Sequence, residues 1–400
     1  MNRRTFVAGA GMLAGASLLA TGAPPLPPLA TAAESASEDE ALRLQPLPAP
    51  GRIDVHHHFM PPAHAQALQR RGLGVFAGQP LAPGSAEDSL ALMDGQGVQT
   101  ALLSLNAPGV YFGDVAAAAT LARRCNEQAA ELASRYPGRF GSLAALPLPA
   151  TDAACREAVH ALDTLQADGV MLLASVDGQF LGDPRFDELM AELDRRHARV
   201  LVHPNLHASS TGLGLEAPSY LLEFACDVSR AAVNLILSGT LERYPRINWI
   251  LANGGGFLPY VAWRVSLANA LPEFAESAPQ GVLNYLRRFY FDTALTAANP
   301  PMAVLRELVE PSHILFGSDY PQATAELVAT QVRQLADSEL WSAELKAGID
   351  RGHALSLFPR FATAGEAVAA APVNESESSL QWLGRSLKKP IGALAQHLKD

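Results

Sequence analysis

The chain has 400 residues, of which 48% are hydrophobic and 18% are charged. This composition provides enough apolar side chains for a large buried core and excludes a globally disordered chain. The formal net charge of -10 comes without basic runs in the body of the chain, which argues against nucleic acid as a partner. The length leaves a choice between one and two domains.

The first residues combine the features of an export signal. Arg3 and Arg4 precede an apolar, glycine-rich run, and small residues at positions 30–32 form an A-x-A cleavage site. A paired arginine ahead of such a run resembles a twin-arginine signal. We therefore expect residues 1–32 to be a signal peptide and the protein to be periplasmic. A retained membrane anchor and an unrelated basic start are the alternatives. Residues 33–51, acidic and then rich in proline, are expected to be a linker.

Short apolar runs then alternate with amphipathic helical stretches. The helix expected over 115–136, for example, repeats its apolar residues with a period near 3.6. Eight such β-then-α units predict a closed (β/α)8 barrel of the TIM type. An open, doubly wound sheet is the alternative, but no Gly-rich dinucleotide loop follows the first strand. The expected strands are residues 52–59, 98–105, 140–147, 169–175, 199–204, 247–255, 288–295 and 314–321.

The three cysteines, Cys125, Cys155 and Cys226, lie far apart in stretches of helical character. No two of them form a C-x-x-C pair. We therefore expect small buried side chains and no disulfide framework.

The first expected strand ends in three consecutive histidines, His56, His57 and His58. Because side chains alternate along a strand, His56 and His58 share one face, and Asp54 lies on that face too. His57 is expected to point outward, between the barrel and its helices. In barrels of this kind the functional groups stand at the carboxyl ends of the strands, so the pair is placed for chemistry.

Two further strands end in residues that can bind a metal. The fifth ends in His203 and the eighth in Asp319. Three imidazole nitrogens and one carboxylate oxygen suit Zn2+ or a similar divalent transition ion, with a position open for water or substrate. We predict one divalent metal ion, with Zn2+ as first choice and Mn2+ as second. His313 precedes the eighth strand and is therefore expected at the opposite, structural face.

Four segments carry a family resemblance: "IDVHHHFMPP", "VLVHPN", "NGGGFLPY" and "ILFGSDYP". Over residues 52–361 the chain resembles the amidohydrolase superfamily. Within it, the chain is similar to the branch of aminocarboxymuconate-semialdehyde, 6-methylsalicylate and o-hydroxybenzoate decarboxylases. The resemblance implies metal-dependent, non-oxidative loss of CO2 from a small aromatic or dienoic carboxylic acid. Relatives with two ions bridge them through a lysine or glutamate on the fourth strand, and residues 169–175 offer neither.

The resemblance also assigns individual residues. His56, His58, His203 and Asp319 match the metal ligands of the family, and Asp319 matches the carboxylate used in proton transfer. Arg264 matches an arginine that reaches the substrate carboxylate, in some relatives across a dimer interface, which implies a homodimer. A surface salt bridge is the alternative for Arg264.

The loop after the second strand offers Tyr111 and Phe112 as aromatic walls for a flat ligand. Plain packing is the equal alternative for both side chains.

Asn253 departs from the family pattern, which has a histidine at this place. An amide can hold a water or a substrate oxygen, but it cannot accept and return a proton near neutral pH. Three hypotheses follow. Asp319 suffices with Asn253 as an orienting group; or the site hydrolyses a lactone or ester with a base elsewhere, such as His207; or the barrel binds metal and ligand without turnover.

The last residues form a linker followed by a basic, amphipathic tail, together residues 362–400. Leucines recur at helical spacing beside lysines, and Pro390 is expected to split the helix. Packing on the barrel or on a partner subunit is one expectation, and weak contact with a membrane surface is the other. His353, in the preceding helix, is expected to be structural.

Overall fold

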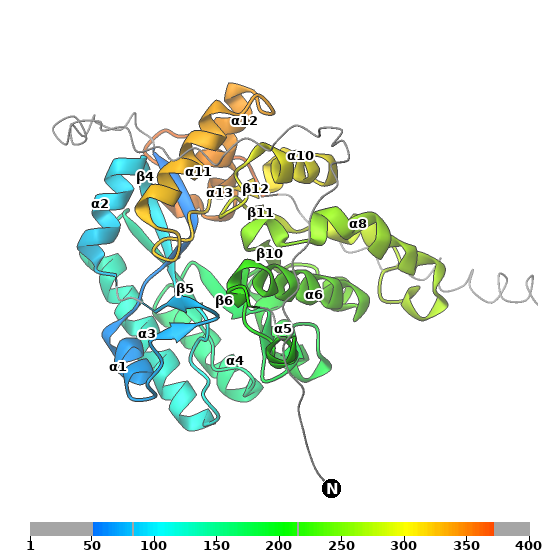
Figure 1. Ribbon diagram of the computed structural model, residues 1–400, viewed down its shortest axis with the longest axis horizontal. Coiled ribbons are helices and arrows are strands. Elements are labelled where there is room, and N and C mark those ends of the chain that lie inside the picture. Colours follow the sequence, from blue (N-terminus) through cyan, green and yellow to red (C-terminus); the bar gives the residue numbers. More distant parts are fainter. Residues whose placement is uncertain (1–50, 82–83, 214–215, 372–400) are drawn as a thin grey trace, which may run out of the picture. The chain divides into compact units, whose positions relative to one another are not determined.

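The computed structural model describes residues 51–81, 84–213 and 216–371 (Figure 1). The expected signal peptide, nearly all of the expected linker and residues 372–400 of the tail lie outside this described part. Eight parallel strands form one sheet in the order β1-β4-β5-β6-β9-β10-β11-β12. They are β1 Arg52–His58, β4 Val98–Ser104, β5 Phe140–Ala145, β6 Gly169–Leu173, β9 Arg199–His203, β10 Asn248–Leu251, β11 Tyr290–Asp292 and β12 Ile314–Leu315.

Backbone hydrogen bonds join β1 to the segment that follows β12. The amide of Val55 donates to the carbonyl of Phe316 at 3.0 Å, and the amide of His58 donates to that of Tyr320 at 2.7 Å. In the other direction, the amide of Asp319 donates to the carbonyl of His56 at 2.8 Å. The first and last strands are thereby linked into a nearly closed barrel. This confirms the predicted (β/α)8 architecture and rules out an open sheet.

Helices lie around the outside of the strands (Figure 1). The helix expected over 115–136 is α3, Val115–Arg135, and the side chain of Asp114 caps it by accepting from the amide of Ala117 at 3.0 Å. No helix in the described ranges is long and apolar enough to cross a membrane. The other α-helices are α1 Pro62–Gln69, α2 Ala86–Gln96, α4 Thr151–Val159, α5 Asp187–Arg195, α6 Glu223–Leu237, α7 Thr240–Arg243, α8 Leu258–Ser266, α9 Val282–Leu286, α10 Asn299–Leu308, α11 Ala325–Asp337, α12 Ala343–Ala347 and α13 His353–Leu357. Two short hairpins, β2 Val75–Phe76 with β3 Gln79–Pro80 and β7 Ser175–Val176 with β8 Gln179–Phe180, complete the strands.

The last three barrel strands are shorter than the apolar runs that predict them. Beyond β10 and β12 the chain turns, because Asn253 and Asp319 adopt left-handed φ angles of 54° and 62°. Residues with such angles cannot continue a strand. The ends of these apolar runs therefore build loops over the mouth of the barrel.

Cys125 is buried in the core, and Cys155 and Cys226 are partly buried on α4 and α6. All three are free thiols. The expected burial holds fully for Cys125 and in part for the other two. Burial raises the pKa of the Cys125 thiol to about 12, which leaves it unreactive near neutral pH.

A buried arginine, Arg351, joins the first described residue to the segment that follows the barrel. Arg351 donates to the carbonyl of Gly51 at 3.0 Å and to that of Phe361 at 2.9 Å. It also forms an ion pair with Glu366 at 2.7 Å. The network includes Glu366, which lies five residues beyond the expected end of the barrel at residue 361.

Candidate metal centre

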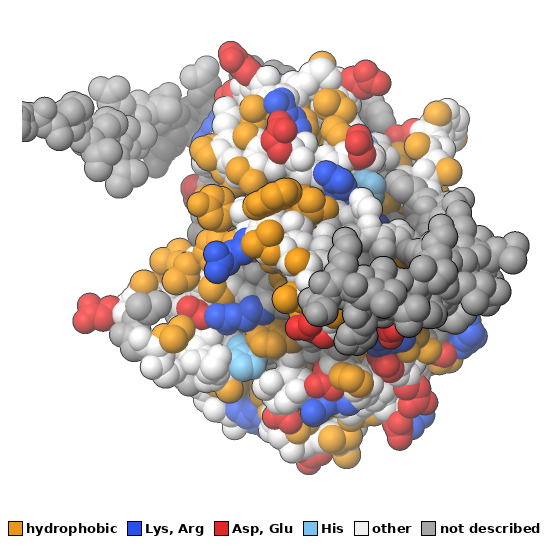
Figure 2. Space-filling view, turned by 90° about the vertical axis from the view of Figure 1, so that its right-hand side faces the viewer, with side chains coloured by type: hydrophobic (Ala, Val, Ile, Leu, Met, Phe, Trp, Pro, Cys, Tyr) orange, Lys and Arg blue, Asp and Glu red, His pale blue; other side chains and the backbone are white. Residues whose placement is uncertain are grey.

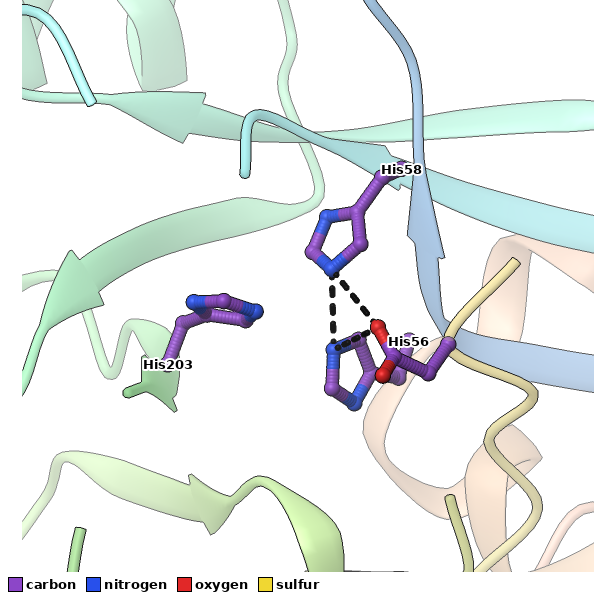
Figure 3. A group of neighbouring side chains, drawn as sticks. His56, His58 and His203 are labelled. Atoms are coloured by element: carbon purple, nitrogen blue, oxygen red, sulfur yellow. Dashed lines mark hydrogen bonds and ion pairs between the residues drawn. The ribbon is translucent and has the colours of Figure 1, made fainter. Parts of the chain in front are cut away.

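Three imidazoles converge at the mouth of the barrel (Figure 3). His56 and His58 come from β1 and His203 from β9, and their ring centroids are 4.7 to 5.2 Å apart. Asp319, in the loop after β12, completes the group. One ligand atom from each residue lies within 4.8 Å of all the others, and all four side chains are buried. The structure therefore brings together the four residues predicted to bind the metal.

Each imidazole uses its Nδ1 atom for a contact outside the group. The contacts join His56 to Asp292 Oδ2 at 2.7 Å, His58 to Ser104 Oγ at 3.1 Å and His203 to the carbonyl of Pro204 at 2.8 Å. The carboxylate beside His56 and the carbonyl beside His203 can only accept, so the proton of these rings sits on Nδ1 and the Nε2 lone pair is free. The Ser104 hydroxyl can accept from Nδ1 of His58 in the same way. The rings are thus oriented as metal-binding histidines usually are.

The inner atoms of the group are all electron-pair donors. Asp319 Oδ1 lies 3.1 Å from His58 Nε2 and 3.4 Å from His56 Nε2. The two Nε2 atoms are themselves 3.1 Å apart. Asp319 Oδ1 is buried without a hydrogen-bond partner among the described residues. Lone pairs facing one another at these distances repel unless a proton or a metal cation lies between them, and three imidazole nitrogens with one carboxylate oxygen fit a divalent metal ion.

The electrostatics point the same way. Burial disfavours a charged ring at His56, yet Asp292 and Asp319 raise its pKa to about 9. Burial lowers the pKa of His58, and burial together with the two neighbouring histidines holds that of His203 well below its usual range. The carboxylates of Asp292 and Asp319 thus favour positive charge at this position, which a bound cation would supply in place of a proton on His56. Burial keeps His58 and His203 in the neutral form that ligands need.

The backbone of Asp319 is held in an unusual conformation. A φ of 62° costs a non-glycine residue on the order of 1 kcal/mol. Hydrogen bonds offset this cost: its amide donates to His56, and its carbonyl accepts from Ala323 at 2.7 Å. The turn directs the carboxylate toward the imidazoles instead of along the strand.

Asp54 does not join the group, contrary to the face expected from alternation. A register shift between Asp54 and His57 interrupts the alternation along β1. The Asp54 carboxylate accepts from the amide of Ser318 at 3.0 Å and lies 3.1 Å from His57 Nδ1. His57 faces α2, as expected, and its Nε2 lies 3.1 Å from Ser89 Oγ. Asp54 and His57 thus support the loop after β12 that carries Asp319.

Asp292 is a residue of this site that the sequence did not point to. It is fully buried at the end of β11, where one oxygen faces His56 and the other accepts from the amides of Asn253 at 2.8 Å and Ala294 at 3.0 Å. Its position as an acidic residue ending the seventh barrel strand was the available signal.

Asn253 is not one of the four ligand residues. Its backbone amide donates to Asp292, which in turn contacts His56. Its side chain donates weakly to the carbonyl of Ala294 at 3.4 Å. His207, the candidate base for hydrolysis, is half-buried. Its ring stacks on Phe180 at 4.7 Å, and its Nδ1 lies 2.7 Å from Ser209 Oγ. His207 is thus occupied in fixing the β7–β8 hairpin.

The remaining predicted residues lie farther out. Arg264 is exposed on α8 and has no ion-pair partner within the described ranges. Tyr111 lines a small cavity with Leu173. Phe112 lies apart from that cavity, under the guanidinium of Arg71 at 4.4 Å.

His313 and His353 are structural, as expected. His313 stacks on Tyr290 at 4.5 Å, and His353 Nδ1 lies 3.0 Å from the carbonyl of Ile314.

Comparisons with known proteins agree with this geometry. The amidohydrolase family profile matches residues 53–360, so the chain belongs to the amidohydrolase family. The chain is 38% identical to decarboxylase yanB of Aspergillus niger, over 78% of this chain and 88% of that protein. It is 37% identical to 6-methylsalicylic acid decarboxylase of Penicillium expansum, over 77% of this chain and 96% of that protein. A crystal structure of 2,6-dihydroxybenzoate decarboxylase complexed with 2,6-dihydroxybenzoate superposes with a TM-score of 0.67 at 26% identity, covering 77% and 99% of the two chains.

Proposed function

We propose that this protein is a metal-dependent, non-oxidative decarboxylase of hydroxybenzoate-type acids, of the 6-methylsalicylate class. The carrying observation is the relationship to 6-methylsalicylic acid decarboxylase over 96% of its length. The buried group of three histidines and one aspartate supports the metal dependence. The enzyme is a carboxy-lyase of the amidohydrolase family.

His56, His58, His203 and Asp319 would hold one divalent ion. We place Zn2+ first because three imidazoles and a carboxylate are its usual ligands, and Mn2+ second. When bound, the ion supplies positive charge that polarises substrate oxygens. The surrounding residues fix the ligands: Asp292 orients His56, and Ser104 orients His58.

Asp319 is the group proposed to move the proton. As a carboxylic acid it would protonate the ring carbon that bears the substrate carboxylate. The bond between this carbon and the carboxylate then breaks, its electron pair returns to the ring, and CO2 leaves. Solvent restores the proton to Asp319. The Asn253 side chain cannot exchange protons, and Asn253 is assigned an orienting role: its backbone amide donates to the Asp292 carboxylate that also holds His56.

The decisive experiment measures metal and turnover on the same preparation. We expect about one equivalent of metal by elemental analysis and CO2 release from 2-hydroxybenzoates, including 6-methylsalicylate. His58→Gln should abolish both, whereas His197→Gln, at an exposed position outside the site, should not. Metal below about a tenth of an equivalent would refute the site. Metal with ester or lactone cleavage but no CO2 release would indicate a hydrolase, and metal without either reaction would indicate a binding protein.

We also propose a homodimer formed through α8. Tyr260 and Trp263 are 82% and 73% exposed on this helix, beside Arg264. Hydrophobic side chains and a few basic ones gather on this side of the molecule (Figure 2). Exposed aromatic clusters of this kind are typical of protein interfaces. A second copy would cover them and bring Arg264 to the substrate carboxylate of its neighbour.

Export to the periplasm is proposed from the first residues alone. The paired arginines and the following apolar run support it. Fractionation of cells that produce the full chain tests this proposal, with Arg3→Lys and Arg4→Lys together as the blocking variant. Processed protein that appears equally from the double variant would contradict a twin-arginine route.

A further inference from the structure

A small cavity lies at the carboxyl ends of β5, β6 and β9. Its volume is about 170 Å3. Its walls include Tyr111, Leu173, Val176 and Leu206, with Asn205 and Asp177 as polar members. Pockets that take a whole small molecule commonly measure about 300 to 1,000 Å3. This cavity therefore has room for part of a ligand, such as a substituent on a ring.

The cavity is adjacent to the metal centre. Leu173 at the end of β6 is paired with His203 at the end of β9. Paired residues of neighbouring parallel strands point to the same side of the sheet, so the wall of the cavity stands beside a predicted metal ligand. Asn205 follows His203 by two residues.

Asn205 is held in a fixed orientation. Its backbone amide donates to Asp227 Oδ2 at 2.8 Å, and its Nδ2 donates to the carbonyl of Ser175 at 2.8 Å. Because a carbonyl can only accept, this second bond determines which side-chain atom is nitrogen. Asp227 is itself buried and accepts from Ser175 Oγ at 2.8 Å, so the support is rigid.

The remaining atom of this amide has no partner. Asn205 Oδ1 is buried and unbonded among the described residues. An unsatisfied buried acceptor is costly, and a donor brought by a ligand would remove that cost. Asp177 also lines the cavity, but it is exposed to solvent. Asn205 Oδ1 is therefore the buried, oriented and unpaired acceptor among the described lining side chains.

We propose that this cavity is the substituent subsite of the aromatic acid and that Asn205 determines its specificity. The apolar wall accepts an alkyl substituent on the ring, and Asn205 Oδ1 accepts a hydrogen bond from a hydroxyl at the same ring position. This inference rests on the proposed function, because it assumes an aromatic acid at the metal centre. It deepens that function by naming the residue that decides between alkyl-bearing and hydroxyl-bearing substrates.

Non-reactive analogues test the subsite without turnover. In 3-methyl-2-nitrophenol and 2-nitroresorcinol a nitro group stands for the carboxylate, and a methyl or a hydroxyl occupies the substituent position. We would measure both Kd values on the metal-loaded protein by calorimetry. Asn205→Leu should shift the ratio of the two affinities toward the methyl compound by about tenfold, because one hydrogen bond is lost and apolar surface is gained. A ratio within about twofold of the wild type would overturn the assignment of Asn205.

Two further variants keep the test sharp. Asn234→Leu is the matched control, because Asn234 also donates its Nδ2 to a backbone carbonyl at 2.8 Å but lies on α6 outside the cavity. Its affinity ratio should equal that of the wild type. Val176→Ala enlarges the cavity. It should shift the ratio of affinities toward 3-ethyl-2-nitrophenol over the methyl compound by about fourfold, which corresponds to burial of one methylene group.

The outcomes separate the two proposals. If the analogues bind and CO2 is released, but neither Asn205→Leu nor Val176→Ala changes its ratio, the subsite is wrong and the decarboxylase stands. If no analogue binds and no CO2 is released, the proposed function is wrong and the subsite falls with it. Metal content measured on every variant confirms that the metal centre is intact.

Discussion

The carboxylate of Asp292 lies 2.7 Å from Nδ1 of His56, and both side chains are fully buried. This contact sets the tautomer of the ring, because a carboxylate can only accept the Nδ1 proton. The Nε2 atom is thereby left free to face Asp319. One carboxylate outside the group thus controls whether His56 can act as a ligand.

Asp292→Asn is expected to weaken metal binding about 10- to 100-fold. The amide oxygen can still accept from the backbone of Asn253 and Ala294, which turns the amide nitrogen toward His56. That nitrogen donates to Nδ1 and moves the ring proton to Nε2, into the metal position. A chelator competition titration measures the affinity, with Asp337→Asn at the exposed end of α11 as control. Equal affinities in both variants would show that Asp292 does not set the tautomer.

Asn253→His is expected to add a titrating group to the site. The position has a φ of 54°, which histidine and asparagine tolerate better than most residues. The variant should therefore fold and retain metal, while kcat gains a dependence on pH near 6 to 7 that the wild type lacks. A pH profile of CO2 release measures this. Activity in the variant alone would mean that the natural protein binds without turnover.

The local pattern of the sequence was sufficient for the barrel and for the four predicted ligands. The apolar runs predict where the strands end, and the residues at those ends include His56, His58, His203 and Asp319. The displacement of Asp54 could not be predicted this way. It depends on a bond with Ser318, which is 264 positions away in the chain, and on a register shift that alternation does not contain.

Asp292 and Asn205 were missed for a related reason. Their roles depend on which atoms their neighbours leave unsatisfied, such as His56 Nδ1 and the carbonyl of Ser175. Sequence spacing places a residue near a strand end, but it does not say which of its atoms will lack a partner.

Acid should destabilise the protein partly through His313. Burial, and to a smaller degree the charge of His353, lower the pKa of His313 to about 4 from an ordinary value of 6.5. The unfolded chain therefore binds a proton that the folded chain rejects, so stability falls as the pH falls from about 6.5 to about 4. The contribution is at most about 3 kcal/mol.

His313→Gln should remove this part of the acid sensitivity. Urea unfolding at pH 7.5 and pH 4.5 gives the change in unfolding free energy for each protein. The change should be smaller in the variant than in the wild type by about 1 to 3 kcal/mol. His197→Asn, at an exposed position with a φ of 51° that asparagine tolerates, is the control and should behave as the wild type. An unaltered pH dependence in His313→Gln would assign the acid sensitivity to other groups.

Trp263→Glu should separate the proposed dimer. A charge at the centre of an apolar contact cannot be desolvated without a partner, so we expect a monomer by light scattering coupled to gel filtration. Val115→Glu, which places the same charge at an exposed apolar position on α3, should leave the dimer intact.

Arg264→Ala should keep the dimer and raise KM for the substrate about 10- to 100-fold, because a charged hydrogen bond to the substrate carboxylate is lost. If the monomer retains the full kcat/KM, Arg264 does not act on the neighbouring site, because separation of the subunits would then leave substrate binding unchanged.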